Sequence, residues 1–420
     1  MEHNPALSLF LALSIIIVAS RVGGTIARHY GQPRVLGELI IGVLLGPTIL
    51  DILHWPIFHG VELGVTIKQL AELGVLLLMF IVGLEVNLSE LAKVGRVAII
   101  AGVIGALAPV LLAMPLSMAF GYGWEPSLFA GVTLAATSVS ISAQVLLELG
   151  FLRTKEGNAL LATALIDDVL AIVLISLAVA ITGGPRAQNS GADLALIVVR
   201  MAVYIAAAFA FAWFVLPRIM NWLAERPQIA QSYGIQAFTL IIALAFAWSA
   251  EELGGVAAIT GAFIAGMGLS RAKEWVREEV ENGVVYLAYA FLVPVFFIDV
   301  GLETDLRSFP MSALPFALLL LAVAIISKVG GCGLGARFGG FSNRESLRVG
   351  VCMIARGEVG LIIASLGLTS GVFTTRDPLY AALFLVILLT TVITPLLVRM
   401  VFPKHPPIET HKAHSGERAS

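Results

Sequence analysis

Long apolar runs separated by short polar connections dominate this chain. A run of about 17–25 mostly apolar residues is long enough to cross the hydrocarbon core of a bilayer as an α-helix. Thirteen such runs can be counted, over residues 5–27, 33–50, 68–88, 95–121, 126–150, 156–182, 194–216, 232–250, 255–270, 283–304, 311–337, 346–371 and 378–402. The pattern predicts an all-α membrane protein with about 13 transmembrane helices. Because many runs follow the first, and no Lys or Arg precedes it, we expect it to be a spanning helix rather than a cleaved signal.

Composition supports lipid as the solvent of this chain. Hydrophobic residues make up 58% of its 420 residues and charged residues only 13%, whereas soluble domains have roughly 45–50% and 25%. The net charge of −2 gives no basic surface for nucleic acid. Cys332 and Cys352 both lie inside apolar runs, which favours packing roles over a disulfide framework or a metal site.

The basic residues predict the orientation. If the N-terminus is outside, nineteen Lys and Arg residues lie in the cytoplasmic connections and the C-terminal tail. Four lie on the opposite side: Lys68, Arg186, Arg307 and Arg376. The positive-inside rule therefore favours an outside N-terminus, a cytoplasmic C-terminus and an odd number of helices.

The chain also contains an internal repeat. The segment Val82-Gly-Leu-Glu85 recurs as Val300-Gly-Leu-Glu303, 218 residues later. This offset corresponds to seven predicted spans, and an odd number places the second copy upside-down relative to the first. Inverted-topology repeats with a substrate site at their interface are a recurring plan of secondary transporters.

Two predicted spans are interrupted by polar residues at mid-depth, and the same offset relates them. Thr137 and Ser138 stand in a hydroxyl-rich stretch, and Arg356 and Glu358 lie in the matching run. Unwound helix at membrane depth exposes peptide groups that can handle an ion where protein shields them from lipid. We therefore predict two broken helices. Two ordinary helices with back-bonded hydroxyls are the alternative.

Asp167 and Asp168 lie near the centre of the sixth span. Ionisable residues inside the membrane are costly and by default mark an ion pathway. Neighbours on a helix point about 100° apart, so both can border one cavity without pointing at one spot. Two acids in a poorly hydrated pocket cannot both ionise freely. Protons would therefore compete with a small hard cation, sodium or lithium, for the carboxylate oxygens.

Other charged residues in the spans receive separate interpretations. Lys328 is the one lysine that lies away from the ends of a predicted span, near mid-depth, so we expect one of the two aspartates to be its partner. For Arg356 and Glu358 we favour a structural role at the crossover over direct ion binding. Asp299 lies near the extracellular end of its predicted span.

Taken together, these residues resemble the bacterial sodium/proton antiporters of the monovalent cation:proton antiporter superfamily, in particular the electrogenic members with paired aspartates. The resemblance rests on the Asp167-Asp168 pair, the interruption at Thr137-Ser138, the context Ser327-Lys-Val-Gly-Gly331 and the stretch Ala355-Arg-Gly-Glu-Val-Gly-Leu-Ile362. It covers about residues 10 to 402.

The resemblance implies a fold in which two broken helices cross inside a core that moves against a dimerising scaffold. It implies Asp168 as the principal sodium ligand, Asp167 as a second ligand paired with Lys328, and Thr137, Ser138, Arg356 and Glu358 at the crossover. The expected unit is residues 1–402, followed by a short cytoplasmic tail, 403–420. This unit is expected to consist of scaffold helices 5–88 and 232–304, core helices 95–182 and 311–402, and linker helix 194–216.

The expected activity is electrogenic exchange of protons for sodium or lithium by alternating access, in a homodimer in the bacterial inner membrane, without a cofactor and without enzymatic chemistry. Potassium/proton exchange and a channel or sensor remain alternatives. Intramembrane aspartyl proteolysis is disfavoured because it needs two acids that face each other from different helices. Asp299 departs from the resemblance, which implies an apolar residue at that position. The short tail and the Asp-Asp pair both argue against the glutathione-gated potassium efflux branch, whose members carry a nucleotide-binding domain and Gln-Asp.

Overall fold

Every regular element in the described part of the computed structural model is helical, as expected for a chain whose peptide groups must be satisfied within lipid. The described residues are 5–58, 63–85, 93–181, 191–226, 233–303, 307, 309–357, 359–360, 363–364, 367, 372–374 and 377–403. The α-helices are α1 (Pro5–His29), α2 (Arg34–Leu45), α3 (Leu63–Glu85), α5 (Gly95–Ala119), α6 (Trp124–Ala135), α7 (Val139–Leu149), α8 (Lys155–Ile181), α9 (Gly191–Phe214), α10 (Leu216–Ala224), α12 (Gly234–Ser249), α13 (Ala258–Leu269), α14 (Glu274–Leu287), α15 (Val293–Leu302), α16 (Leu314–Phe338), α17 (Asn343–Cys352) and α19 (Pro378–Val401). Short 3-10 turns are η1 (Ile52–His54), η2 (Pro56–Phe58) and η5 (Met311–Ala313), and π-helical turns are η3 (Ala250–Gly254) and η4 (Ala288–Leu292).

The all-α membrane fold predicted from the sequence is confirmed, while the exact number of spans stays a prediction. Ten helical segments in the described residues are long and apolar enough to cross a membrane. Three predicted spans are not among them. Helices α2 and α13 have only 12 residues each, and the predicted span 346–371 falls partly outside the described residues.

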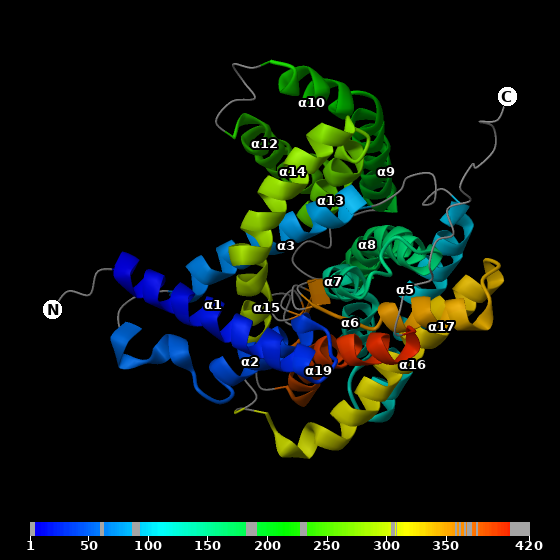
Figure 1. Ribbon diagram of the computed structural model, residues 1–420. Helices are drawn as coiled ribbons and strands as arrows, with labels where there is room; N and C mark the ends of the chain where they lie inside the picture. The colour runs from blue at the N-terminus through cyan, green and yellow to red at the C-terminus, as the bar shows by residue number, and fades with distance from the viewer. Residues whose placement is uncertain are drawn as a thin grey trace.

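The helices form two sets that pack mainly within themselves. In one set, α5 packs against α6, α8 and α16, and α16 packs against α17 and α19. In the other, α3 packs against α13 and α15, and α2 packs against α1 and α15. Figure 1 shows α10, α12, α13 and α14 at the top of the view and α5, α16 and α17 at the lower right. Helix α7 contacts both sets, touching α8 and α19 on one side and α2 and α3 on the other.

The repeat found in the sequence also relates whole helices of the two halves. At the same 218-residue offset, α5 corresponds to α16, α8 to α19, and α3 to the run from α14 to α15. Helices α5 and α16 lie side by side, with Gly331 against Ile104 and Gly335 against Ala101. Because the numbering rises along one helix as it falls along the other, the two copies run antiparallel. This is the relationship that an inverted repeat requires.

The glycines of the repeated motif explain its recurrence by packing. A Cβ on Gly83 would lie 2.3 Å from the carbonyl oxygen of Phe263, and a Cβ on Gly301 would lie 2.2 Å from the carbonyl carbon of Gly42. Each glycine thus allows two helix backbones to touch, as small residues commonly do between membrane helices. The motif marks equivalent helix contacts in the two halves.

Candidate ion-binding site

Two helical segments that pack with α5 and α16 are each interrupted near their middle, at positions related by the repeat. Helix α6 ends at Ala135, and extended residues lead into α7 at Val139. In the second copy α17 ends at Cys352, residues 354–357 are not helical, and helical residues resume at 359. Both predicted interruptions therefore occur as non-helical segments. Glu358, predicted to lie at the crossover, is outside the described residues.

The two breaks meet. The backbone N–H of Ser138 donates to the carbonyl of Ala355 at 2.9 Å, and the Ser142 hydroxyl donates to the carbonyl of Cys352 at 2.5 Å. The sequence separation between Ser138 and Ala355 is one residue less than the repeat offset, so the two residues lie at nearly equivalent positions of the two copies. Peptide groups that lose their helical partners in one segment thus find partners in the symmetry-related segment, which lets irregular backbone persist at this depth.

Arg356 braces the crossing point. Its side chain is fully buried, and its guanidinium donates to the carbonyls of Leu134 at 2.9 Å, Ile354 at 2.6 Å and Ala324 at 3.0 Å. These carbonyls belong to three separate segments. A planar guanidinium with five donors is suited to tie several carbonyl groups together. Arg356 thus joins these three segments at the crossing point.

Thr137 contributes a different feature to the break. Its side chain is 5% exposed, and within the described residues its hydroxyl oxygen has no hydrogen-bond partner. A buried hydroxyl without a partner is unusual and calls for an explanation, such as a bound ion or water. Thr137 thus offers an oxygen ligand beside unwound backbone.

Helix α8 presents its two aspartates to different surroundings. Lys328 of α16 donates from Nζ to both carboxylate oxygens of Asp167, at 2.9 and 3.1 Å. The side chains of this ion pair are 0% and 1% exposed. Of the two aspartates, it is therefore Asp167 that the structure places against the lysine.

Asp168, by contrast, borders a small cavity. The cavity has about 20 Å³ of space for the centre of a water molecule, roughly what one water needs. Thr260 of α13 donates to Asp168 Oδ2 at 3.3 Å. The remaining lining side chains are apolar and come from α3, α7, α8 and α13: Met79, Val139, Leu161, Ala164, Leu165, Ile259 and Phe263. The cavity thus lies where the two helix sets meet.

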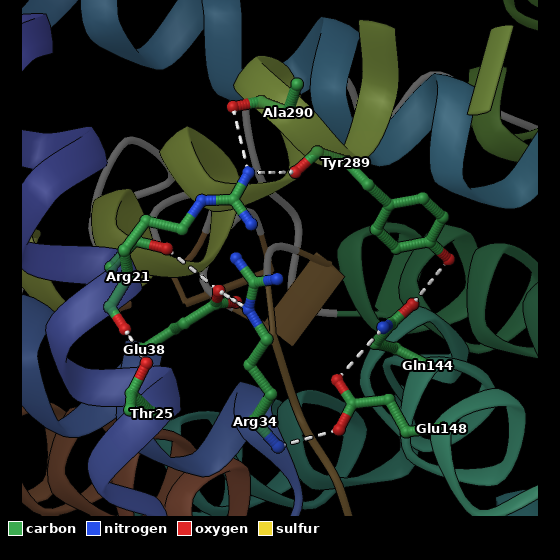
Figure 2. Close-up of polar contacts among 9 residues, drawn as sticks. Arg21, Thr25, Arg34, Glu38, Gln144, Glu148, Tyr289 and Ala290 are labelled. Carbon is green, nitrogen blue, oxygen red and sulfur yellow. Dashed lines mark hydrogen bonds and ion pairs between the residues drawn. The ribbon is translucent and has the colours of Figure 1, made fainter. Parts of the chain in front are cut away.

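A second polar cluster joins the two sets near the C-terminal end of α7. The Tyr289 hydroxyl donates to Gln144 at 2.8 Å, Gln144 donates to Glu148 at 3.1 Å, and the backbone N–H of Arg34 donates to Glu148 at 2.6 Å. Figure 2 shows this chain of contacts, in which Arg34 also binds Glu38. The cluster lines a cavity of about 290 Å³. It ties α7 to α2 and to the π-helical turn η4.

Sequence reasoning missed three of these residues. Thr260 escaped notice because it is a single threonine in an apolar run, and Gln144 and Tyr289 because they lie 145 residues apart. For Thr260, the one signal in the sequence was that a polar residue stands beside glycines at the start of a short predicted span. Asp299, singled out in the sequence, lies in the last turns of α15 and is not among the residues that line the Asp168 cavity.

Comparison with known proteins decides the family. A family model described as sodium/hydrogen exchanger, transmembrane, matches residues 13–404. The chain belongs to the sodium/hydrogen exchanger family. This exchanger is 37% identical over 387 residues to a Na(+)/H(+) antiporter of Enterococcus hirae, covering 92% of this chain and 96% of that one. It is 34% identical over 393 residues to the Na(+)/H(+)-K(+) antiporter GerN of Bacillus cereus, covering 94% and 96%.

A solved structure supports the fold of the exchanger. The sodium proton antiporter MjNhaP1 from Methanocaldococcus jannaschii matches with a TM-score of 0.66 at 16% identity, covering 95% of this chain and 98% of that one. Family membership confirms the predicted resemblance to monovalent cation:proton antiporters. The exchanger is a multi-pass membrane transporter rather than an enzyme, its activity is sodium/proton exchange, and such exchange needs no cofactor.

Proposed function

We propose that the exchange takes place at Asp168, which binds a sodium or lithium ion and a proton in turn. The observation that carries this proposal is its position in a small cavity between the two helix sets, whose other lining side chains apart from Thr260 are apolar. A carboxylate inside the membrane is costly when charged, and either a proton or a hard cation neutralises it. Because both use the same oxygens, binding of one excludes the other. This exclusion couples the two fluxes.

Asp167 and Lys328 give the exchange its electrical character in this proposal. A buried pair keeps its charges only while both partners are ionised and in contact. A cation that draws the Asp167 carboxylate toward Asp168 would break the pair and free Lys328 to release its proton. Two protons then move for one cation, and each cycle carries net charge. The supporting observation is that the pair is almost completely buried.

The crossover supplies neutral ligands and a rigid frame. The buried Thr137 hydroxyl and the carbonyls of the broken segments are the hard oxygens that a sodium ion prefers. Ser138 and Arg356 hold the two breaks together, and we propose that Glu358 completes this frame. The sodium site in this proposal is therefore Asp168 and Asp167 together with oxygens of the first broken helix.

Alternating access requires the two helix sets to move against each other. We assign residues 95–182 and 311–402 to a moving core, residues 5–88 and 232–304 to a scaffold, and residues 194–216 to a linker. The contacts of Glu148 and Gln144 with Arg34 and Tyr289 cross this boundary. They would hold one side closed in the present arrangement and would have to break when that side opens.

The sequence and the resemblance also support proposals for orientation, location and assembly. The excess of Lys and Arg in the connections that follow odd-numbered spans supports an outside N-terminus and a cytoplasmic C-terminus. The bacterial relatives support the inner membrane. We also propose a homodimer that associates through the scaffold. Potassium is a second candidate cation, because GerN is named as a Na(+)/H(+)-K(+) antiporter.

Reconstituted vesicles provide the test. Sodium, lithium and potassium are added in turn to vesicles with an acidic interior, and proton movement is followed with and without an imposed voltage. Asp168→Asn should abolish cation-driven proton movement, whereas Asp51→Asn, which alters an acid beside η1, should leave it intact. Exchange that survives in Asp168→Asn would refute the assignment of the site. Exchange that ignores the imposed voltage would refute the electrogenic step.

A further inference from the structure

Thr260 is a scaffold side chain that hydrogen-bonds the proposed ion-binding carboxylate. It lies in the first turn of α13 and is 4% exposed. Its hydroxyl donates to Asp168 Oδ2 at 3.3 Å, which is longer than the roughly 2.7 Å typical of a hydroxyl and a carboxylate. A bond of this length is weak, so an entering cation can displace it at small cost.

The chemistry of the cavity limits which neutral group can help to bind the ion there. Among its described lining residues, Asp168 and Thr260 are the ones with side-chain oxygens. A hydroxyl carries one donor hydrogen and two lone pairs, and its hydrogen can rotate. It can therefore donate to an empty carboxylate and, after rotation, offer an oxygen to a bound cation.

We propose that Thr260 is a specificity-determining residue of the exchanger, whose hydroxyl oxygen ligates the cation beside Asp168. The proposal rests on the proposed role of Asp168 as the cation-binding carboxylate. In the empty site the hydroxyl positions the carboxylate, and in the loaded site it replaces part of the hydration shell of the ion. The scaffold thus takes part in ion recognition as well as in support of the moving core.

The size of the ion decides which cations depend most on this contact. Lithium and sodium are small, hard cations that gain more from a short contact with a neutral oxygen than potassium does. The cavity has room for about one water, so few water molecules can replace a missing hydroxyl. Loss of the hydroxyl should therefore weaken lithium and sodium binding more than potassium binding.

Variants of similar size separate a ligand role from a packing role. Thr260→Val keeps the shape of the side chain and removes its oxygen, while Thr260→Ser keeps the oxygen. The matched control is Thr239→Val in α12, because Thr239 is also a buried scaffold threonine but its hydroxyl donates to the carbonyl of Ile235 at 2.8 Å. All three are compared with the wild type and with Asp168→Asn in vesicles, using sodium, lithium and potassium chloride.

We expect Thr260→Val to raise the KM for sodium and lithium roughly tenfold, as befits the loss of one polar contact to a charged group. The KM for potassium and the maximal rate should change less. Thr260→Ser should stay close to wild type, and Thr239→Val should show unchanged KM values. If Thr260→Val does not fold, as judged by gel filtration, Thr260→Ala is assayed with the same expectation.

The outcomes distinguish this inference from the proposed function. If Asp168→Asn abolishes exchange while Thr260→Val or Thr260→Ala keeps the wild-type KM for all three cations, the role of Thr260 is wrong and that of Asp168 stands. If Asp168→Asn retains exchange, the proposed function itself is wrong. Equal increases of KM in Thr260→Val and Thr239→Val would also overturn the inference, because they would indicate a packing effect.

Discussion

Lys328 and Asp167, 161 residues apart in the chain, form an ion pair from which water is almost completely excluded. Lys68 and Glu303 form a second pair with a shorter distance, 2.6 Å against 2.9 Å, but with side chains that are 57% and 31% exposed. Judged by distance alone, the Lys68–Glu303 pair would contribute more to stability. Burial reverses the order, because an exposed pair is worth little while a buried charge left without its partner is very costly.

Lys328→Gln should therefore destabilise the protein strongly, by about 3–5 kcal/mol, because Asp167 would remain as a buried carboxylate without a counter-charge. Lys328→Gln combined with Asp167→Asn should recover most of this loss. Lys68→Gln is the matched control and should cost less than about 1 kcal/mol. Thermal unfolding in detergent checks all three. Equal losses in Lys328→Gln and Lys68→Gln would contradict the importance of burial.

The contacts of Gln144 with Tyr289 and of Glu148 with Arg34 should limit the motion of α7. Tyr289→Phe removes the hydroxyl that donates to Gln144. The free energy needed to open the closed arrangement should therefore fall by about 1 kcal/mol. Amide hydrogen exchange measured over residues 139–150 should then accelerate several-fold. Tyr286→Phe serves as the control, because Tyr286 lies in the neighbouring α14 but is 78% exposed. Equal exchange in the two variants would show that the Tyr289 contact does not restrain α7.

The repeated glycines predict a contrast in stability. Gly83→Ala and Gly301→Ala would each place a Cβ within 2.3 Å of the backbone of a neighbouring helix, and such overpacking typically costs about 1–3 kcal/mol or more. Gly330 of α16 has nothing within 4 Å of its Cβ position, so Gly330→Ala should be neutral or slightly stabilising. Unfolding temperatures of the three variants check this. A loss in Gly330→Ala as large as in Gly83→Ala would contradict it.

Several parts of this architecture could be predicted from the sequence because each rests on a strong local signal. Apolar runs of spanning length indicate membrane helices, and charges in the middle of such runs mark Asp167, Asp168 and Lys328. The repeated motif relates the two halves, and the same offset relates the two polar interruptions around Ser138 and Arg356. These signals gave the all-α fold and the residues that meet at its centre.

Other features depend on which helices touch, and no local pattern encodes them. A Lys328 partner among the aspartates was expected, but only the packing of α16 near α8 selects Asp167. Thr260 contacts Asp168 and Tyr289 contacts Gln144 only because helices that are distant in the chain pack together. The count of spans was hard to fix because α2 and α13 are short apolar helices. Hydropathy alone does not distinguish these short helices from the longer spanning helices.

The start of α17 gives a prediction about pH. Glu345 and Ser342 form a capping box, in which the Ser342 hydroxyl accepts from the Glu345 N–H and the Ser342 N–H donates to Glu345 at 2.7 Å. Burial opposes ionisation of Glu345, but hydrogen bonds to its carboxylate from the Ser342 backbone N–H and hydroxyl, together with the ion pair with Lys155, outweigh it and lower the pKa of Glu345 below its ordinary value of 4.5. Such a carboxylate stabilises the folded state above about pH 4.5 and loses this contribution as the pH falls toward its folded pKa.

Glu345→Gln should therefore lower the unfolding temperature at pH 6, and the difference from wild type should shrink as the pH falls from 5 to 3. Ser342→Ala should cost about 1 kcal/mol through the lost cap and should also flatten the pH dependence, because it removes the hydroxyl contact that helps to lower the pKa of Glu345. Unfolding scans across this pH range in detergent provide the measurement. A wild-type advantage over Glu345→Gln that persists unchanged at pH 3 would show that the stabilisation does not depend on the charge of Glu345. The start of α17 matters for the site because this helix leads directly into the broken segment that Arg356 braces, so a frayed first turn would loosen the crossover from its outer end.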